Sequence, residues 1–214
     1  MTGDRMTVRA ALETLLAGNR RFTAGSPEHP NQDAARRAAT APAQSPFAVL
    51  FGCSDSRLAA EIIFDRGLGD LFVVRTAGHV MGPEVLGSIE YGVSVLGSPL
   101  VVVLGHDSCG AVAATRAAVQ DGTTATGYVR DVIERVTPSV LAARAAGRTE
   151  DGDFIDTHIH HTVDLLVERS RTLADAVEAG TVAVVGLSYR LADGTARVVT
   201  ARGLDTATLV AARQ

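Results

Sequence analysis

The sequence predicts an α/β fold in which helices flank a mostly parallel central sheet of about four parallel strands plus an antiparallel edge strand. Two observations lead to this prediction. Short apolar runs alternate along the chain with longer segments in which apolar residues recur at helical spacing, as in parallel sheets whose strands are joined by helices. The chain has 214 residues, 46% of them hydrophobic, which suffices for one such domain with a buried core.

The first predicted element is an amphipathic helix over residues 7–22, with Leu12 and Leu16 on its apolar face. The proline-containing segment GSPEHPNQD, at 25–33, follows it and is predicted as a loop. Because this loop separates the helix from the rest of the chain, we expect residues 1–30 to form a helical arm and loop that packs on a neighbouring subunit.

Five segments have the composition of β-strands. The first four are apolar on both faces, as expected for strands buried inside a parallel sheet. The fifth follows an ADG turn and is predicted as the antiparallel edge strand. In chain order these segments are 47–52, 71–75, 100–105, 182–189 and 196–201.

Helical patterns occupy the intervals between these strands, and the last two are separated by the polar segment GRTEDGD. We find no internal repeat. The whole chain, residues 1–214, is therefore predicted as a single domain. The predicted helices are 82–96, 109–120, 127–146 and 153–178.

Composition excludes several classes of function. The formal charge is −4 and no segment is strongly basic, so nucleic acid is not an expected partner. All 20 basic residues are Arg, which excludes Schiff-base chemistry on lysine and a P-loop lysine. No run approaches the ~18 apolar residues of a membrane span, and the charged N-terminus is not a signal peptide. We therefore expect a cytoplasmic protein without a membrane partner, in which two cysteines indicate metal binding or catalysis more often than a disulfide.

The two cysteines of the chain each follow a predicted strand that ends in glycine. Cys53 comes after the first strand, and His106 and Cys109 come after the third. Ligands of open α/β sheets bind beyond the carboxyl ends of the strands, so these three side chains converge if the two strands are neighbours. Two thiolates and an imidazole suit Zn²⁺, and three protein ligands leave the fourth position open, as in catalytic zinc sites.

Two charged residues follow Cys53 closely. Asp55 could fill the fourth zinc position or hold a water there, and Arg57 could pair with its carboxylate through two parallel hydrogen bonds. The alternatives are inert buried thiols, a disulfide, or a chance match of the HxxC spacing.

The motifs in which these residues lie resemble the signature motifs of β-class carbonic anhydrases. The similarity extends from the N-terminal helix to the strand at 182–189. It is carried by CSDSR at 53–57, GHDSCGAV at 105–112, GNRRF at 18–22, GDLFVVRTAGH at 69–79 and GSIEYGVSVL at 87–96.

The resemblance implies an enzyme that interconverts carbon dioxide and bicarbonate through a zinc-bound hydroxide, with one Zn²⁺ per chain and a homodimer or homotetramer as the assembly. The residues that match the family's zinc ligands are Cys53, His106 and Cys109. Asp55 and Arg57 match its catalytic dyad, and in some members the aspartate itself binds zinc. The chain departs from the family's common asparagines at Thr76 and His79. The residues that match the lining of the carbon dioxide pocket, part of it contributed by the partner subunit, are Gln44, Phe72 and Tyr91.

The ligand charges predict a pH dependence. Two thiolates neutralise Zn²⁺ and make it a weaker Lewis acid than a zinc held by three imidazoles, so we expect the bound water to ionise above about pH 7 and activity to rise on the alkaline side.

The other histidines have simpler interpretations. His158, His160 and His161 form the sequence HIHH inside a predicted helix, where a solvated helix face is the expected role. We interpret His79 as a loop or interface histidine rather than a proton relay.

Three alternative functions are consistent with the same residues. A hydrolase of carbonyl sulfide or carbon disulfide would use the same zinc site. A non-catalytic zinc-stabilised module would keep Asp55 as a permanent fourth ligand. A thiol redox protein would join Cys53 to Cys109, although the chain lacks a CxxC pair.

Overall fold

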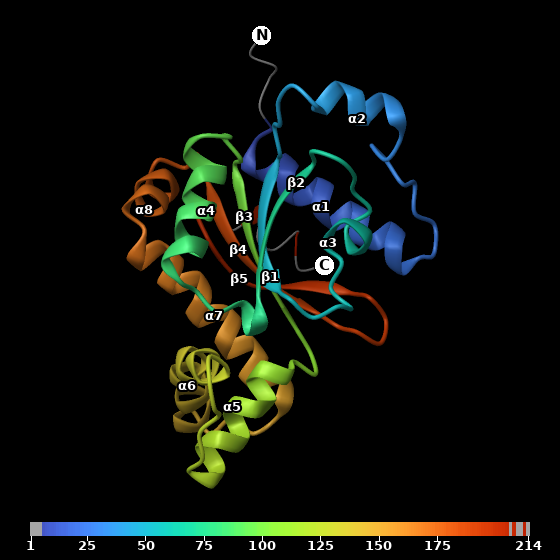
Figure 1. The fold of residues 1–214 in the computed structure, drawn as a ribbon. Helices are drawn as coiled ribbons and strands as arrows, with labels where there is room; N and C mark the ends of the chain where they lie inside the picture. The colour runs from blue at the N-terminus through green and yellow to red at the C-terminus, as the bar shows by residue number, and fades with distance from the viewer. Residues whose placement is uncertain (1–5, 206, 209–211, 213–214) are drawn as a thin grey trace.

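A computed structural model, which describes residues 6–205, 207, 208 and 212, contains the predicted central sheet (Figure 1). Its strand order is β2-β1-β3-β4-β5. The first four strands pair in parallel, and β5 is an antiparallel edge strand. The predicted fold class is confirmed. The strands are β1 Ala48–Cys53, β2 Leu71–Thr76, β3 Leu100–His106, β4 Ala183–Tyr189 and β5 Ala196–Arg202.

One strand was predicted in the wrong environment. β1 and β3 are buried throughout, as their apolar runs predict. β2 lies at the edge of the sheet, where its residues are only half-buried and Arg75 is exposed. Among the described residues β2 pairs with β1 alone and has no neighbouring strand on its other side, so the prediction of a strand inside the sheet was wrong.

The helices follow the predicted pattern with three differences. The short helix α3, Ala60–Ile63, was not predicted. A short helix, α2, begins after the cap residue Asp33 in a segment that was not predicted as helical. The predicted helix 153–178 is two helices, because Ser170 leaves the helical conformation and its hydroxyl caps α8 by accepting from the backbone N–H of Leu173 at 3.1 Å. The helices are α1 Val8–Thr23, α2 Ala34–Thr40, α3 Ala60–Ile63, α4 Pro83–Ser94, α5 Gly110–Asp121, α6 Val129–Ala145, α7 Asp151–Arg169 and α8 Arg171–Glu178, with a 3₁₀ turn, η1, at Ala77–His79.

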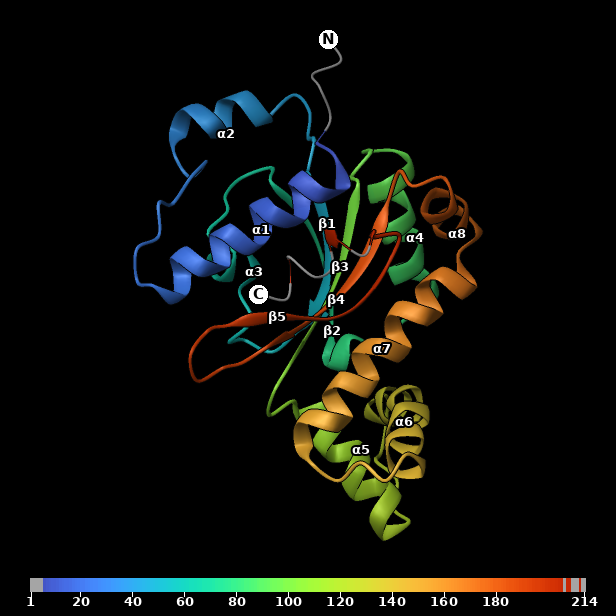
Figure 2. The same ribbon diagram turned by 180° about the vertical axis from the view of Figure 1, so that it is seen from behind.

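Helices cover both faces of the sheet, and α1 lies on the face opposite α4 and α7 (Figures 1 and 2). The apolar side of α1 is buried on its own chain. Its Asn19 amide donates to the carbonyls of Ile63 at 3.2 Å and Gly194 at 2.8 Å. α1 is therefore anchored on its own domain, and the packing of residues 1–30 on a neighbouring subunit stays a prediction.

α7 packs closely on the sheet because two strands carry glycine where it crosses. A Cβ at Gly105 would lie 2.6 Å from Ile159, and one at Gly186 would lie 2.5 Å from the same side chain. Beyond this crossing α7 continues past the carboxyl ends of the strands, where it packs with α5 and α6 (Figure 1). None of the helices in the described part of the chain combines the length and the apolar character that a membrane crossing requires.

Candidate metal centre

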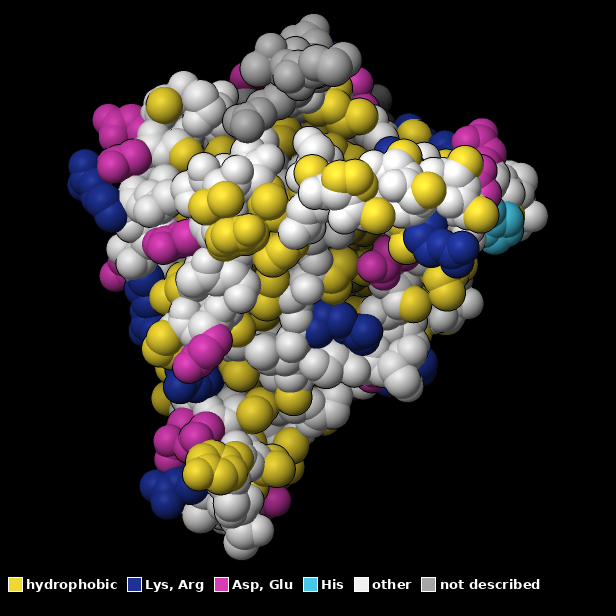
Figure 3. All heavy atoms as spheres, turned by 45° about the horizontal axis from the view of Figure 1, so that its top comes forward, with side chains coloured by type: hydrophobic (Ala, Val, Ile, Leu, Met, Phe, Trp, Pro, Cys, Tyr) yellow, Lys and Arg dark blue, Asp and Glu magenta, His cyan; other side chains and the backbone are white. Residues whose placement is uncertain are grey.

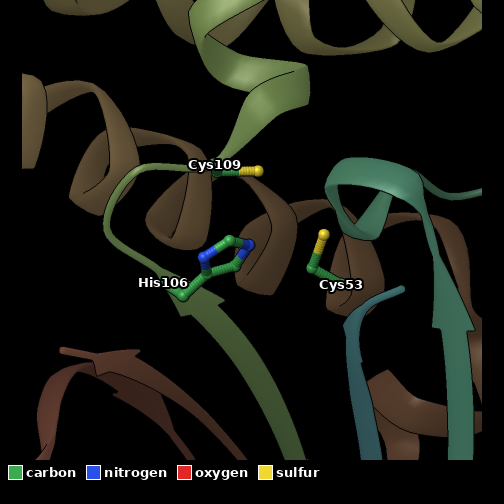
Figure 4. A group of neighbouring side chains, drawn as sticks. All are labelled: Cys53, His106 and Cys109. Carbon is green, nitrogen blue, oxygen red and sulfur yellow. The ribbon is translucent and has the colours of Figure 1, made fainter. Parts of the chain in front are cut away.

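The carboxyl ends of β1 and β3 bring together the three residues predicted to bind metal (Figure 4). The two strands are parallel neighbours, with Gly52 opposite Leu104, which is the arrangement that brings these side chains together. Cys53 is the last residue of β1, and His106 is the last residue of β3. Cys109 immediately precedes the first turn of α5. The backbone alone therefore places two sulfurs and one imidazole at the same edge of the sheet.

The ligand atoms of Cys53, His106 and Cys109 lie within 4.8 Å of one another, and all three side chains are buried. Both cysteines are free. Ligand atoms around a tetrahedral zinc are separated by about 3.3–3.8 Å, so small shifts of these side chains would suffice to bind one ion. The set of two sulfurs and one nitrogen is the chemistry that zinc prefers.

The His106 ring is oriented for a metal by its other nitrogen. Its Nδ1 lies 2.7 Å from the backbone carbonyl oxygen of Asp107. A carbonyl can only accept, so Nδ1 carries the hydrogen and Nε2 keeps its lone pair. Nε2 is buried and has no hydrogen-bond partner among the described residues. A buried lone pair without a partner is unfavourable unless a cation or proton binds it, so the residues fit a zinc ion.

The two thiols interact strongly. The neighbouring Cys109 thiol lowers the pKa of Cys53, and the same interaction, together with burial, raises the pKa of Cys109. The backbone N–H of Gly78 also donates to the Cys53 sulfur at 3.3 Å. A divalent cation bound between the two sulfurs would stabilise both of them as thiolates.

Asp55 and Arg57 lie beside this group and pair with each other. Arg57 donates from Nε to Oδ1 of Asp55 at 2.9 Å and from Nη2 to Oδ2 at 2.7 Å. These hydrogen bonds hold the pKa of the Asp55 carboxyl well below its usual range. Oδ2 of Asp55 is also 3.9 Å from Nε2 of His106. Asp55 is not part of the group of ligand atoms within 4.8 Å of one another, so in this structure its carboxylate faces Arg57.

A second arginine fixes the turn that carries Asp55. Arg75, on the neighbouring strand β2, donates from Nε to the carbonyl of Cys53 at 3.0 Å and from Nη2 to the carbonyl of Asp55 at 2.6 Å. This cross-strand contact was not predicted, because it depends on β1 and β2 being adjacent.

The carbonic anhydrase family model matches residues 48–196 of the chain, a range that includes every residue of this site. The chain belongs to the β-carbonic anhydrase family. It is 57% identical over 187 residues to carbonic anhydrase 2 of Mycobacterium tuberculosis, covering 87% of this chain and 90% of that protein.

Solved β-carbonic anhydrases have the same fold. The enzyme of Aspergillus fumigatus superposes with a TM-score of 0.68 at 24% identity, covering 94% of this chain and 98% of that one. One of the tetrameric β-carbonic anhydrases of Sordaria macrospora superposes with a TM-score of 0.66 at 21% identity, covering 76% and 84%.

The residues that the carbonic anhydrase resemblance assigns to the substrate pocket lie away from this chain's own metal centre. Phe72 precedes Thr76, the pairing partner of Cys53, by four residues, about 13 Å along an extended strand. Tyr91, on α4, is 45% exposed, and its ring centroid is 6.1 Å from that of Phe72. Gln44 is exposed before β1. Their role as pocket residues stays a prediction.

Two histidines of this carbonic anhydrase are buried against expectation. His158 is 3% exposed and His79 is 1% exposed. The prediction that His158 lies on a solvated helix face was wrong, because it shares the buried side of α7 with Ile155, Ile159 and Thr162. The helical spacing of those neighbours was the available signal. His79 lies in the 3₁₀ turn η1, directly after Gly78, and a role for it at a subunit interface stays a prediction.

Proposed function

We propose that the protein is a zinc-dependent carbonic anhydrase that interconverts carbon dioxide and bicarbonate, with one Zn²⁺ per chain held by Cys53, His106 and Cys109. The observation that carries this proposal is the convergence of three buried donor atoms beside a paired carboxylate and guanidinium. Family membership and the name of the Mycobacterium tuberculosis relative support it.

When bound, Zn²⁺ lowers the pKa of a water molecule and so supplies a nucleophile near neutral pH. Asp55 is ionised and lies beside the metal-facing nitrogen of His106. It can therefore accept a hydrogen bond from the attacking water and orient it toward the carbon of carbon dioxide. Arg57 keeps Asp55 charged and fixes its direction.

The position of Asp55 favours catalysis over a purely structural zinc site. A non-catalytic module requires Asp55 as a permanent fourth ligand, whereas the observed carboxylate accepts hydrogen bonds from the side chain and the backbone N–H of Arg57. This pairing leaves the fourth position for water and substrate.

The protein is proposed to act as a homodimer or homotetramer whose pocket is completed by a partner subunit. Gln44, Phe72 and Tyr91 lie too far from their own metal centre to line it and would line the partner's. Large apolar side chains are also exposed on α4 and after α3, among them Tyr91, Val95 and Leu68. Figure 3 views this end of the molecule, where hydrophobic side chains gather in the middle and charged ones mostly toward the rim.

The two thiolate ligands are compatible with the reducing cytoplasm, where we place the protein.

Carbonyl sulfide hydrolysis could use the same residues, so the test compares two substrates. Zinc-loaded protein should hydrate carbon dioxide in stopped-flow measurements far faster than it hydrolyses carbonyl sulfide. The variant D55N should lose most of that hydration activity while it keeps its zinc. Faster turnover of carbonyl sulfide, or full carbon dioxide activity in D55N, would contradict the proposal.

A further inference from the structure

The turn η1 connects the metal centre to the helices beyond the sheet. On one side, the backbone N–H of Gly78 donates to the Cys53 sulfur at 3.3 Å. On the other side, the carbonyl of Gly78 lies 2.9 Å from Nε2 of His158, on α7. His158 is 80 residues away in the chain from Gly78, so the tertiary structure alone brings this side chain to the turn.

The hydrogen-bond partners of His158 determine which of its two ring nitrogens carries a hydrogen. The Gly78 carbonyl can only accept, so Nε2 of His158 carries a hydrogen and donates it. Nδ1 of His158 lies 2.9 Å from the Ser139 hydroxyl oxygen. In the neutral ring this nitrogen is an acceptor, so Ser139 donates to it. Burial lowers the pKa of His158 to about 4, which keeps the ring neutral and this pattern intact near pH 7.

The turn has a strained conformation. Gly78 has φ +63° and His79 has φ +42°, and a left-handed backbone is unfavourable for a residue with a side chain such as His79. Neither ring nitrogen of His79 has a hydrogen-bond partner within the described residues. Its ring is held by stacking on His158, with the two ring centroids 4.3 Å apart. Contacts with His158 therefore stabilise this turn, together with the edge-on contact of His79 with Phe51 and the hydrogen bond from the Thr76 hydroxyl to the Val80 carbonyl.

A cavity of about 230 Å³ lies beside His158. Its lining also includes His79, Met81 and Pro138. The ring itself is 3% exposed, and its two hydrogen bonds give it a defined orientation in this buried place.

We propose that His158 is a positioning residue of the metal centre, which holds the Gly78 carbonyl so that the adjacent Gly78 N–H stays directed at the Cys53 sulfur. The inference rests on the proposed function only in taking Cys53 as a zinc ligand. An N–H···S hydrogen bond withdraws charge from a thiolate ligand and limits its movement. Removing a group that supports a metal ligand through hydrogen bonds typically weakens metal binding about 10- to 100-fold.

The test compares two substitutions of the same residue in the full-length protein. H158Q keeps an N–H donor near the position of Nε2, whereas H158F keeps the ring shape without a donor. Zinc affinity is measured by competition with a chromophoric chelator. The thiolate-to-metal charge-transfer band is measured after substitution with Co²⁺. Neither readout requires that the enzyme hydrate carbon dioxide, so a failure of the proposed activity and a failure of this inference are distinguishable.

We expect H158F to bind zinc about 10- to 100-fold more weakly and to shift the Co²⁺ charge-transfer band. H158Q should stay close to the unmodified protein in both measurements. Unchanged affinity and an unchanged band in H158F would overturn the proposal. An equal loss in both variants would also overturn it, because the ring shape and not the donor would then be what matters.

A milder variant covers the case in which H158F does not fold. S139A removes only the hydrogen bond that orients Nδ1 of His158. We expect it to shift the Co²⁺ band in the same direction as H158F, by a smaller amount. A folded S139A protein with the unmodified band and affinity would count against the positioning role.

Discussion

The Arg57 guanidinium holds the Asp55 carboxylate through two parallel hydrogen bonds, with Nε 2.9 Å from Oδ1 and Nη2 2.7 Å from Oδ2. The backbone N–H of Arg57 adds a third bond to Oδ1 at 2.9 Å. Together they fix both the charge and the direction of the carboxylate beside the proposed metal ligands. Planar, two-point pairing of this kind is specific to arginine.

Replacing Arg57 should therefore reduce activity without loss of zinc. R57K keeps the positive charge but offers a single-point contact, so we expect roughly a 10-fold loss of carbon dioxide hydration, and R57A should lose about 100-fold. Stopped-flow rates normalised to the zinc content of each sample measure both. Turnover by zinc-loaded R57A at the rate of the unmodified protein would show that the pairing has no catalytic role.

Burial of His158 predicts an acid-sensitive fold. Its pKa is lowered from 6.5 to about 4, so between these two values the unfolded chain binds a proton that the folded chain does not. The contribution of His158 to the free energy of unfolding is therefore fully present above pH 6.5 and declines as the pH falls toward 4. When the pH falls from 7 to 5, the free energy of unfolding of H158Q should therefore decrease by about 2 kcal/mol less than that of the unmodified protein.

Urea titrations of the unmodified protein and H158Q at the two pH values measure this difference. Identical pH dependence of the two proteins would contradict the assignment of a neutral, buried His158.

The close packing of α7 on the sheet predicts opposite effects for two glycine-to-alanine substitutions. G186A places a Cβ 2.5 Å from Ile159, and overpacking of this kind should lower the free energy of unfolding by about 1–3 kcal/mol. G152A, in the first turn of α7, meets no atom within 4 Å and should leave stability unchanged or raise it by up to about 1 kcal/mol. Denaturant titration compares them, and equal stabilities would refute the observed helix–sheet contact.

The proposed assembly predicts a charge-sensitive surface at Tyr91. Y91E introduces a carboxylate among exposed apolar side chains, so sedimentation velocity should detect smaller species and carbon dioxide hydration should fall. Tyr128, 89% exposed before α6, provides the control, and Y128E should change neither property. An unchanged assembly state in Y91E would argue against a subunit interface at this surface.

The strands and the three residues of the candidate metal centre were predictable because their signals are local. An apolar run that ends in glycine indicates a buried strand, and Cys53 and His106 end two such strands. Once β1 and β3 are neighbours, the convergence of these side chains follows from the parallel arrangement.

The remaining features depend on tertiary contacts. The edge position of β2 is set by strand order, which composition does not report, and the contact of Arg75 with the Cys53 turn follows from it. His158 appeared solvated because its neighbours in the sequence are polar, whereas the residues three and four positions away decide which face of a helix is buried.

The proposed function depends above all on the binding of one catalytic zinc ion by Cys53, His106 and Cys109. Its most direct test is reconstitution of metal-free protein with measured amounts of Zn²⁺, followed at each step by stopped-flow hydration of carbon dioxide. Activity should rise in proportion to bound zinc and reach its maximum at one ion per chain. In C109S it should not be restored by stoichiometric zinc. Activity that is independent of zinc, or fully zinc-loaded protein that does not hydrate carbon dioxide, would contradict this proposal.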